Sequence, residues 1–331
     1  RYRGACAEIA RSQVLRATSR VDAMVTIRNP CYAPKAQTPS RPCRVQHGDV
    51  SPMPRKTLPR LLRFLVLFCL GPGLSRAAEF DQRMANFSTR AQAGVGVEAA
   101  FVGFAIGPGA PKTVLIRAVG PALTGFGVSG ALADPKIELY SGDRLIGEND
   151  NWTTASVGGV TAFSQVGAFP IAANSRDAAA TVTLSPGAYT AIVRGVAEGT
   201  GIALVEVYDV SGEARLRNLS TRARVGTGAG VLISGLAVAP GGPSRRILAR
   251  AAGPALTGLG VSGALADPFI AVIESDTARQ IGSNDNWSST EATALTAAFT
   301  QAGAFTFAAG SRDSALMVDL PPGKSYSVQV S

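Results

Sequence analysis

The chain has 331 residues, a formal net charge of +9 and a hydrophobic content of 46%. The charge is uneven, because residues 1–77 hold 14 Lys and Arg against 3 Asp and Glu, whereas residues 78–331 hold 18 against 20. The nearly neutral second part argues against a nucleic-acid partner. All 4 cysteines and the single histidine precede residue 78, which excludes thiol or imidazole catalysis and Cys/His zinc sites from the remainder.

The N-terminal region predicts export. Residues 1–52 are rich in Arg and Pro without steady apolar periodicity, so we expect a disordered or non-native upstream segment. Residues 53–78 resemble a secretory signal peptide: a basic stretch, an apolar run over 64–70, and small residues up to Ala77 and Ala78. The apolar run is too short to span a bilayer. We therefore expect a secreted or cell-surface protein with no membrane span in the mature chain.

The remainder contains one unit twice. "NFSTRAQAG" (86–94) returns as "NLSTRARVG" (218–226), and the stretch at 117–135 returns at 250–268 with 17 of 19 positions identical. "NDNW", "GAF", "SRD" and a late Pro-Gly follow in the same order in both copies. Such self-similarity indicates a tandem repeat. The predicted domains are repeat 1 at 79–213 and repeat 2 at 214–331.

Both copies read mainly as strands. Short segments rich in β-branched and aromatic residues, bounded by Gly, Pro, Ser or Asp, predict strands at 95–106, 113–119, 136–141, 178–184, 188–195 and 202–210. Residues 289–303 alone have helical periodicity. The pattern predicts an all-β fold of two tandem antiparallel, jelly-roll-like β-sandwiches.

Repeat 2 lacks a counterpart of the "IALVEVYD" strand, since it stops at "YSVQVS". We expect it to be cut in mid-domain, with an unpaired edge and an exposed apolar face. This predicts that repeat 2 is the less stable of the two.

The tetrad Asn-Asp-Asn-Trp occurs at 149–152 and at 284–287. One interpretation is a turn whose Asn and Asp cap backbone amides while the indole enters the core. A second is a calcium site, because calcium favours several oxygen ligands. A third makes Trp152 and Trp287 exposed platforms for a sugar ring. The candidate metal ligands are Asn149, Asp150, Asn151 and Asp177 in repeat 1, and Asn284, Asp285, Asn286 and Asp313 in repeat 2.

Two "SRD" motifs bear on the calcium hypothesis. Asp177 and Asp313 could complete an oxygen cage with the tetrads. Their neighbours Arg176 and Arg312 could equally form ion pairs that hold the loop, which is the more common outcome for such residues.

The carboxylates argue against catalysis. Paired carboxyls are the remaining enzymatic route, and repeat 1 offers Glu138 and Glu148 among others. Repeat 2 has an apolar or β-branched position in place of Glu138, and Ser283 in place of Glu148. Copies that keep turn residues but not carboxylates indicate a scaffold, so we expect no enzyme.

The run from "NLSTRARVG" to "NDNW" resembles repeat units of large secreted proteins of Verrucomicrobia and related bacteria. "IELYSGDRLIGENDNW" with "SPGAYTAIVRGV" is also similar to bacterial pre-peptidase C-terminal domains. The resemblance covers 86–331 and implies a non-catalytic β-sandwich module of an exported protein. Its role would be structural or adhesive, with an extracellular polysaccharide or a cell-surface protein as partner. The alternative is a calcium-stabilised accessory or carbohydrate-binding module of a larger secreted hydrolase.

Overall fold

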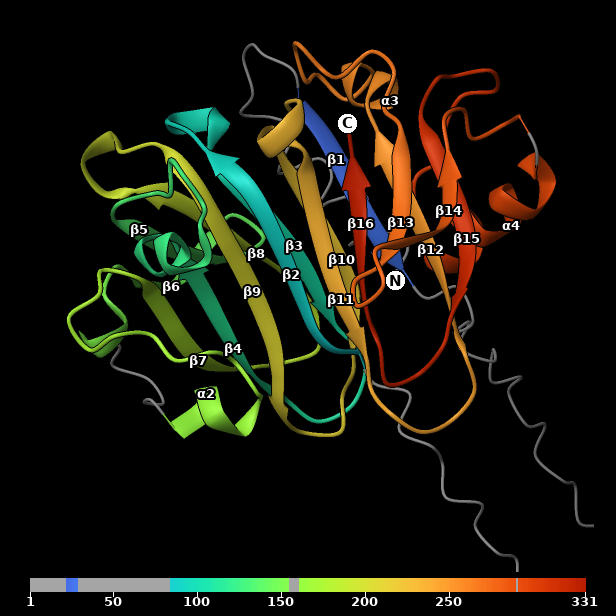
Figure 1. Ribbon diagram of the computed structural model, residues 1–331. Coiled ribbons are helices and arrows are strands. Elements are labelled where there is room, and N and C mark those ends of the chain that lie inside the picture. Colours follow the sequence, from blue (N-terminus) through green and yellow to red (C-terminus); the bar gives the residue numbers. More distant parts are fainter. Residues whose placement is uncertain (1–21, 29–83, 155–160, 290) are drawn as a thin grey trace, which may run out of the picture. The chain divides into compact units, whose positions relative to one another are not determined.

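The structure is a computed structural model that describes residues 22–28, 84–154, 161–289 and 291–331, all within one compact unit. It is an all-β protein dominated by antiparallel strands (Figure 1). Repeat 1 contains β2 (Met84–Ala93), β3 (Ala100–Ile106), β4 (Lys112–Val119), β5 (Pro135–Ser141), β6 (Arg144–Asn149), β7 (Ala178–Leu184), β8 (Gly187–Gly195) and β9 (Gly201–Ser211). Repeat 2 contains β10 (Leu216–Arg224), β11 (Leu232–Val238), β12 (Arg245–Ala252), β13 (Ile270–Glu274), β14 (Arg279–Asn284), β15 (Ser314–Leu320) and β16 (Ser325–Val330).

The helices are short. They comprise α2 (Thr161–Gln165), α3 (Pro254–Thr257), α4 (Ala292–Ala302) and the 3-10 turns η1 (Gly96–Glu98), η2 (Pro121–Phe126), η3 (Trp152–Thr154), η4 (Val196–Glu198) and η5 (Gly228–Gly230). The helix predicted at 289–303 is confirmed as α4, which buries Leu295, Ala298 and Phe299. Gly303 ends α4 with a φ of +65°, a conformation that glycine adopts without strain. No helix within the described ranges is long and apolar enough to cross a membrane.

The strands pair in two runs, and the two repeats interleave. One run is β7-β4-β9-β2-β11-β16-β13-β14, and the other is β15-β12-β1-β10-β3-β8-β5-β6. The pair Gln92–Arg224 of β2 and β10 joins the runs into one sheet network. The first strand of repeat 1, β2, therefore pairs with β11 of repeat 2, and the first strand of repeat 2, β10, pairs with β3 of repeat 1. Two independent sandwiches in a row are not confirmed.

A buried polar contact lies where the first strands of the two repeats meet. The hydroxyl oxygens of Thr89 and Thr221 are 2.7 Å apart, and Thr89 Oγ1 is 3.3 Å from Ser234 Oγ. Thr89 and Thr221 occupy the same place in the duplicated Asn-x-Ser-Thr-Arg motif. This motif therefore recurs because each copy supplies half of a joint between the repeats.

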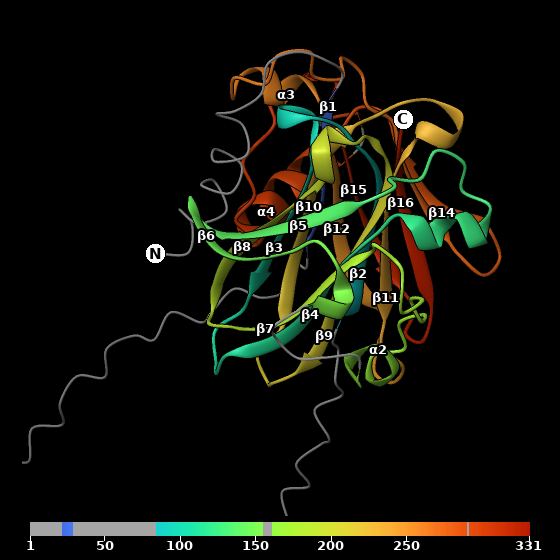
Figure 2. The same ribbon diagram turned by 90° about the vertical axis from the view of Figure 1, so that its left-hand side faces the viewer.

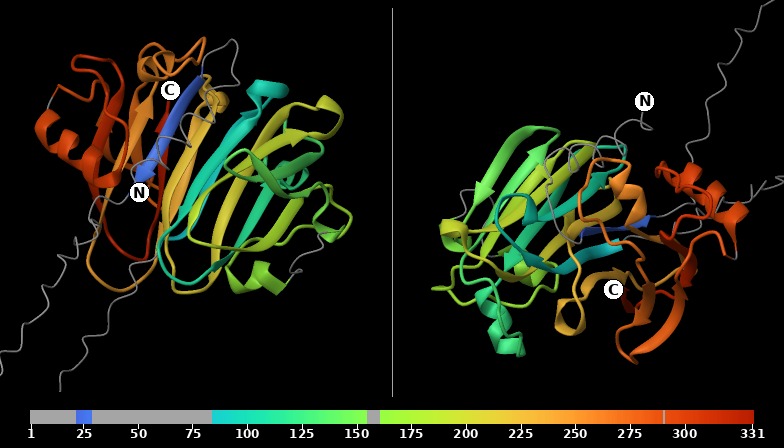
Figure 3. Two further views of the ribbon diagram at one scale, coloured as in Figure 1. Left: turned by 180° about the vertical axis from the view of Figure 1, so that it is seen from behind. Right: turned by 90° about the horizontal axis from the view of Figure 1, so that it is seen from above.

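A strand from the upstream segment completes repeat 2. The strand β1 (Asp22–Arg28) lies between β10 and β12, as β9 lies between β2 and β4 in repeat 1 (Figure 3). Residues 22–28 are thus an ordered strand within the segment expected to be disordered or non-native, and they fill the edge expected to be open in repeat 2. The physical reason is that a gap between two strands offers unpaired backbone groups on both sides, and those groups require partners. The rest of residues 1–52 and the signal segment predicted at 53–78 lie outside the described residues.

Apolar side chains from both runs form a common core. Ile137 and Leu139 of β5 are buried, while the alternate residues Glu138 and Tyr140 are partly exposed, as the alternation in "IELY" predicts. The same core includes Val205 and Val207 of β9 and Phe87 of β2. In Figure 2, which faces repeat 1, β5, β6 and β8 lie above β4, β7 and β9.

Candidate functional site

The tetrad of repeat 1 is tied to a buried carboxylate, Asp177, at the start of β7. Asp177 Oδ1 accepts a hydrogen bond from Gly120 N at 2.6 Å, and Oδ2 accepts one from Ala122 N at 3.3 Å. The Ser175 hydroxyl also donates to Asp177 Oδ2. The carbonyl of Asp177 accepts a hydrogen bond from Trp152 N at 2.9 Å. We call these residues the Asp177 cluster. Its carboxylate holds the "GPAL" turn (residues 120–123) against the tetrad.

Repeat 2 builds the same arrangement around Asp313. Gly253 N and Ala255 N donate to Asp313 Oδ1 at 2.7 and 3.1 Å, and the Ser311 hydroxyl donates to Oδ2. Trp287 N donates to the Asp313 carbonyl at 2.8 Å. We call these residues the Asp313 cluster. The agreement shows that the repeated motifs encode one local structure.

The glycine of the "GPAL" turn is required by a close approach of two backbone segments. A Cβ on Gly120 would lie 2.0 Å from the carbonyl oxygen of Leu132, and a Cβ on Gly253 would lie 2.0 Å from that of Leu265. Both separations are too short for any side chain. The glycine-rich stretch thus serves the fold of the loop.

The first asparagine of each tetrad bridges two backbone segments. Asn149 Oδ1 accepts a hydrogen bond from Ala179 N at 2.9 Å, and Asn149 Nδ2 donates to the carbonyl of Asn151 at 2.9 Å. Asn284 repeats both contacts with Ala315 N and the carbonyl of Asn286, at 3.0 and 3.2 Å. This is the geometry of a side chain that satisfies backbone groups in a turn.

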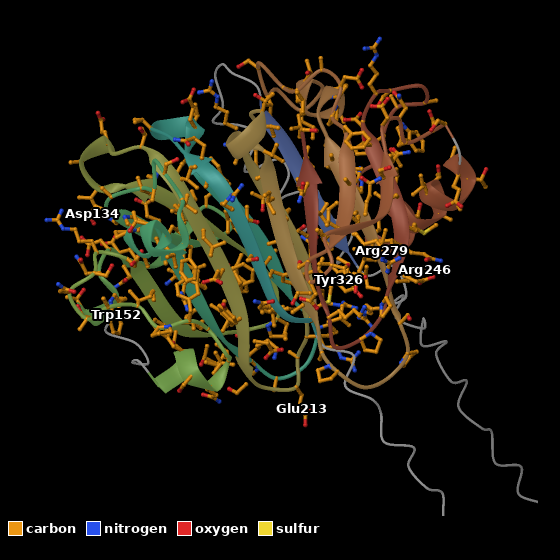
Figure 4. All side chains as sticks on the ribbon, viewed as in Figure 1. Asp134, Trp152, Glu213, Arg246, Arg279 and Tyr326 are labelled. Carbon is orange, nitrogen blue, oxygen red and sulfur yellow. The ribbon has the colours of Figure 1, made fainter. Side chains whose placement is uncertain are left out.

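Both indoles lie in the core. Trp152 (labelled in Figure 4) packs on Phe163 with ring centroids 5.6 Å apart, and Trp287 packs on Phe299 at the same separation. Their exposed fractions are 9% and 5%, and each Nε1 donates to a backbone carbonyl, of Ala172 or Ala308, at 3.1 Å. A sugar platform needs an open ring face, so this placement favours the turn-and-core interpretation.

The other two aspartates proposed as metal ligands, Asp150 and Asp285, lie on the surface. Asp150 and Asp285 are exposed, and each accepts a hydrogen bond from the following asparagine, Asn151 or Asn286. Within the described ranges no group of three or more His, Cys, Asp or Glu side chains is placed to hold a metal ion.

The arginines beside the buried aspartates form ion pairs with the Asp-Pro segments before β5 and β13. Arg176 Nη1 lies 3.1 Å from Asp134 Oδ2, and Arg312 Nη1 lies 3.0 Å from Asp267 Oδ2. The ion-pair interpretation is therefore confirmed, with partners that the sequence did not identify. Because both arginines are largely exposed, these pairs position the loop and add little stability.

A second buried polar network lies on β4 and β9 in repeat 1. Arg117 Nε is 3.2 Å from Glu206 Oε2, and both side chains are almost completely buried. The Tyr208 hydroxyl donates to Glu206 Oε1 at 2.7 Å. Burial raises the pKa of Glu206, whereas Arg117 and Tyr208 act in the opposite direction. Arg117 also donates to the carbonyl of Phe169 at 2.9 Å and stacks 4.2 Å from that ring.

In repeat 2 the same arginine position is held by Arg250 on β12. Arg250 Nη2 donates to the carbonyl of Phe305 at 2.6 Å, and the guanidinium lies 4.0 to 4.5 Å from the rings of Phe299, Phe305 and Phe307. Sequence reasoning did not identify these arginines as structural. The available signal was an arginine at the same place in two strands and flanked by apolar residues in both, "VLIRAV" and "ILARAA".

A shallow hollow of about 530 Å³ lies beside β12, β15 and the start of α4. Its charged lining residues are Arg246 (labelled in Figure 4), Glu291 and Asp319. Arg246 Nε donates to Asp319 Oδ1 at 2.8 Å, and this pairing holds the pKa of Asp319 below its ordinary value. A carboxylate held ionised by a partner is poorly suited to act as a general acid.

The residues repeated between the two copies thus serve local structure at every position described above. Comparisons of the chain with protein-family models, with curated proteins and with solved structures each return no match.

Proposed function

We propose that this chain is a non-catalytic repeat module of a secreted or cell-surface protein, with a structural, adhesive or binding role. The observation that carries the proposal is the matching pair of Asp177 and Asp313 clusters. In both clusters the residues kept between the copies bind the protein's own backbone, as expected of a scaffold whose value lies in its fold and surface.

Export is supported by the sequence of residues 53–78. A basic start, an apolar run and small residues before Ala77 and Ala78 are the features that secretion machinery reads. Residues 78–331 contain no cysteine, so burial rather than disulfides must stabilise this part of the chain. The partner of such a module would be an extracellular polysaccharide or a cell-surface protein.

The alternative is a calcium-stabilised accessory or carbohydrate-binding module of a larger hydrolase. It rests on the exposed carboxylates of Asp150 and Asp285, which lie at the same place in the turn of each repeat and accept a hydrogen bond from the Nδ2 of Asn151 or Asn286. Hard oxygen donors of this kind are the ligands that calcium prefers.

Expression of the full chain in a secreting bacterium tests the proposal. We expect the protein in the extracellular or surface fraction, with a new N-terminus after Ala77 or Ala78, because these small residues suit signal cleavage. N-terminal sequencing of each fraction measures this outcome. Uncleaved protein retained in the cytoplasm would contradict the proposal. A melting temperature that rises with calcium in the full chain, and not in Asp150→Ala/Asp285→Ala, would favour the alternative.

A further inference from the structure

The gap between β10 and β12 in repeat 2 is built as a site for one strand. We call this gap the acceptor slot. In repeat 1 the equivalent gap lies between β2 and β4 and holds β9. In repeat 2 it holds β1, which pairs antiparallel with both neighbours (Figure 3).

Register shows that β1 and β9 occupy equivalent positions. Val205 of β9 lies opposite Thr89, and Val25 of β1 lies opposite Thr221, the counterpart of Thr89. On the other side of the slot, Glu206 lies opposite Arg117 and Thr26 lies opposite Arg250. The two strands therefore match residue for residue, with Val25 at the place of Val205 and Thr26 at the place of Glu206.

Side-chain burial follows this match. Val205 and Val207 are completely buried in the apolar core, and Val25 and Ile27 enter the same core with 1% exposure each. Alternate positions of any strand in the slot therefore face the core. This pattern selects a segment with β-branched apolar residues at every second position.

The fit of β1 differs from that of β9 in length and in charge. The strand β9 has 11 residues, whereas β1 has 7, and the pairing of β1 with β12 begins only at Met24. The strand β9 also brings the carboxylate of Glu206 to the guanidinium of Arg117, whereas β1 brings the hydroxyl of Thr26 to the position of Arg250. A strand of the β9 type would place a carboxylate beside Arg250 and pair over a longer stretch.

The two strands also differ in how they are connected. In repeat 1 the short turn η4 connects β8 directly to β9, so a short connection holds β9 in its place. The strand β1 precedes β2 by the segment 29–83 and is paired with strands more than 180 residues away in sequence. An incoming strand can therefore take the place of β1 without any change in the loops between β10 and β16.

We propose that the acceptor slot is a binding site for an extended peptide of the β9 type, and that β1 is a replaceable occupant of this site. The ligand is a strand with apolar β-branched residues at alternate positions and a carboxylate between them, bound by strand addition on both edges. The inference rests on the topology of the fold. It also agrees with the proposed function, because cleavage after Ala77 or Ala78 would remove β1 and leave the acceptor slot open to such a strand.

A labelled peptide of residues 201–211 tests the proposal on the full chain. The first measurement uses the wild-type chain, with hydrogen exchange followed peptide by peptide. The second uses Thr26→Pro, because proline removes a backbone donor from a strand paired on both sides and should free the slot. The matched control is the same peptide with Val205→Asp and Val207→Asp, which presents charge to the apolar core.

We expect saturable binding of the peptide to Thr26→Pro, with a higher melting temperature on addition and binding at least about tenfold weaker for the control peptide. In the wild-type chain we expect faster exchange at residues 22–28 as the peptide enters, and unchanged exchange at residues 201–211. Absence of binding to both chains would overturn the proposal, as would binding that leaves exchange at residues 22–28 unaltered. If Thr26→Pro fails to fold, the wild-type measurement decides.

Discussion

Replacement of Asp177 by alanine is expected to lower the free energy of unfolding by at least about 3 kcal/mol, because three donors lose a buried acceptor at about 1 to 3 kcal/mol each. The donors are the amides of Gly120 and Ala122 and the hydroxyl of Ser175. Asp313→Ala should have an effect of the same size, since the Asp313 cluster repeats these contacts. Urea unfolding of the full chain measures both changes.

The matched controls for these variants are Asp150→Ala and Asp285→Ala. Both residues carry the same carboxyl group within the neighbouring tetrad, but they are exposed, and each carboxylate accepts a hydrogen bond from the following asparagine. Their replacement should change stability by less than about 0.5 kcal/mol. Equal effects of Asp150→Ala and Asp177→Ala would show that burial of the Asp177 carboxylate is not what stabilises the turn.

Arg117→Ala is the second variant with a large expected effect, a loss of about 3 to 5 kcal/mol, because it leaves a buried carboxylate without its cation. The change also removes the hydrogen bond to the carbonyl of Phe169 and the stacking on that ring. The remaining Glu206 should then titrate at a pKa still further above its ordinary value, since burial persists and the opposing guanidinium is gone. Equilibrium unfolding at neutral pH measures the stability change.

A double-mutant cycle separates the interaction energy between Arg117 and Glu206 from the effect of removing each side chain alone. Arg117→Ala/Glu206→Ala should recover part of the loss, because the second change removes the uncompensated charge. Lys136→Ala is the matched control, since Lys136 pairs with Glu148 at 2.9 Å on the surface. Such a pair contributes about 1 kcal/mol or less. A small effect of Arg117→Ala, comparable with that of Lys136→Ala, would contradict a structural role for the buried pair.

The sequence predicted the elements of the fold well because their signals are local. The strands predicted between 113 and 210 and the helix at 289–303 follow from spacing and turn chemistry within a few residues. The strand predicted at 95–106 is shorter, because η1 precedes β3. Interior placement of Trp152 and Trp287 was one of three interpretations that the sequence left open, and their burial in the structure favours it.

The partners of β2 and β10 in the other repeat, which are β11 and β3, could not be predicted. The sequences of β2 and β10 are nearly interchangeable. "NFSTRAQAG" and "NLSTRARVG" share the Thr whose hydroxyl lies in the joint between the repeats, so local sequence favours neither repeat over the other. The choice depends on the connections and on contacts between residues more than 100 positions apart. Long-range pairing of this kind leaves no mark on periodicity.

The role of β1 was missed for a related reason. "DAMVTIR" is a short run within an Arg- and Pro-rich segment, and nothing in it specifies a partner. Its fit becomes visible only when the registers of β9 and β1 are compared, since Val25 and Ile27 then correspond to Val205 and Val207. Buried arginines such as Arg117 were missed because a charged residue in a strand usually marks the solvent face.

The most direct test of the interleaved fold is urea unfolding followed by the fluorescence of one tryptophan at a time. Trp287→Phe leaves Trp152 as a reporter for repeat 1, and Trp152→Phe leaves Trp287 as a reporter for repeat 2. We expect each single-tryptophan chain to unfold in one transition that coincides with loss of its β-sheet circular dichroism, because β2 and β10 each extend strands of the other repeat. A fluorescence transition in either chain that is well separated from loss of the remaining sheet structure would contradict the interleaved fold.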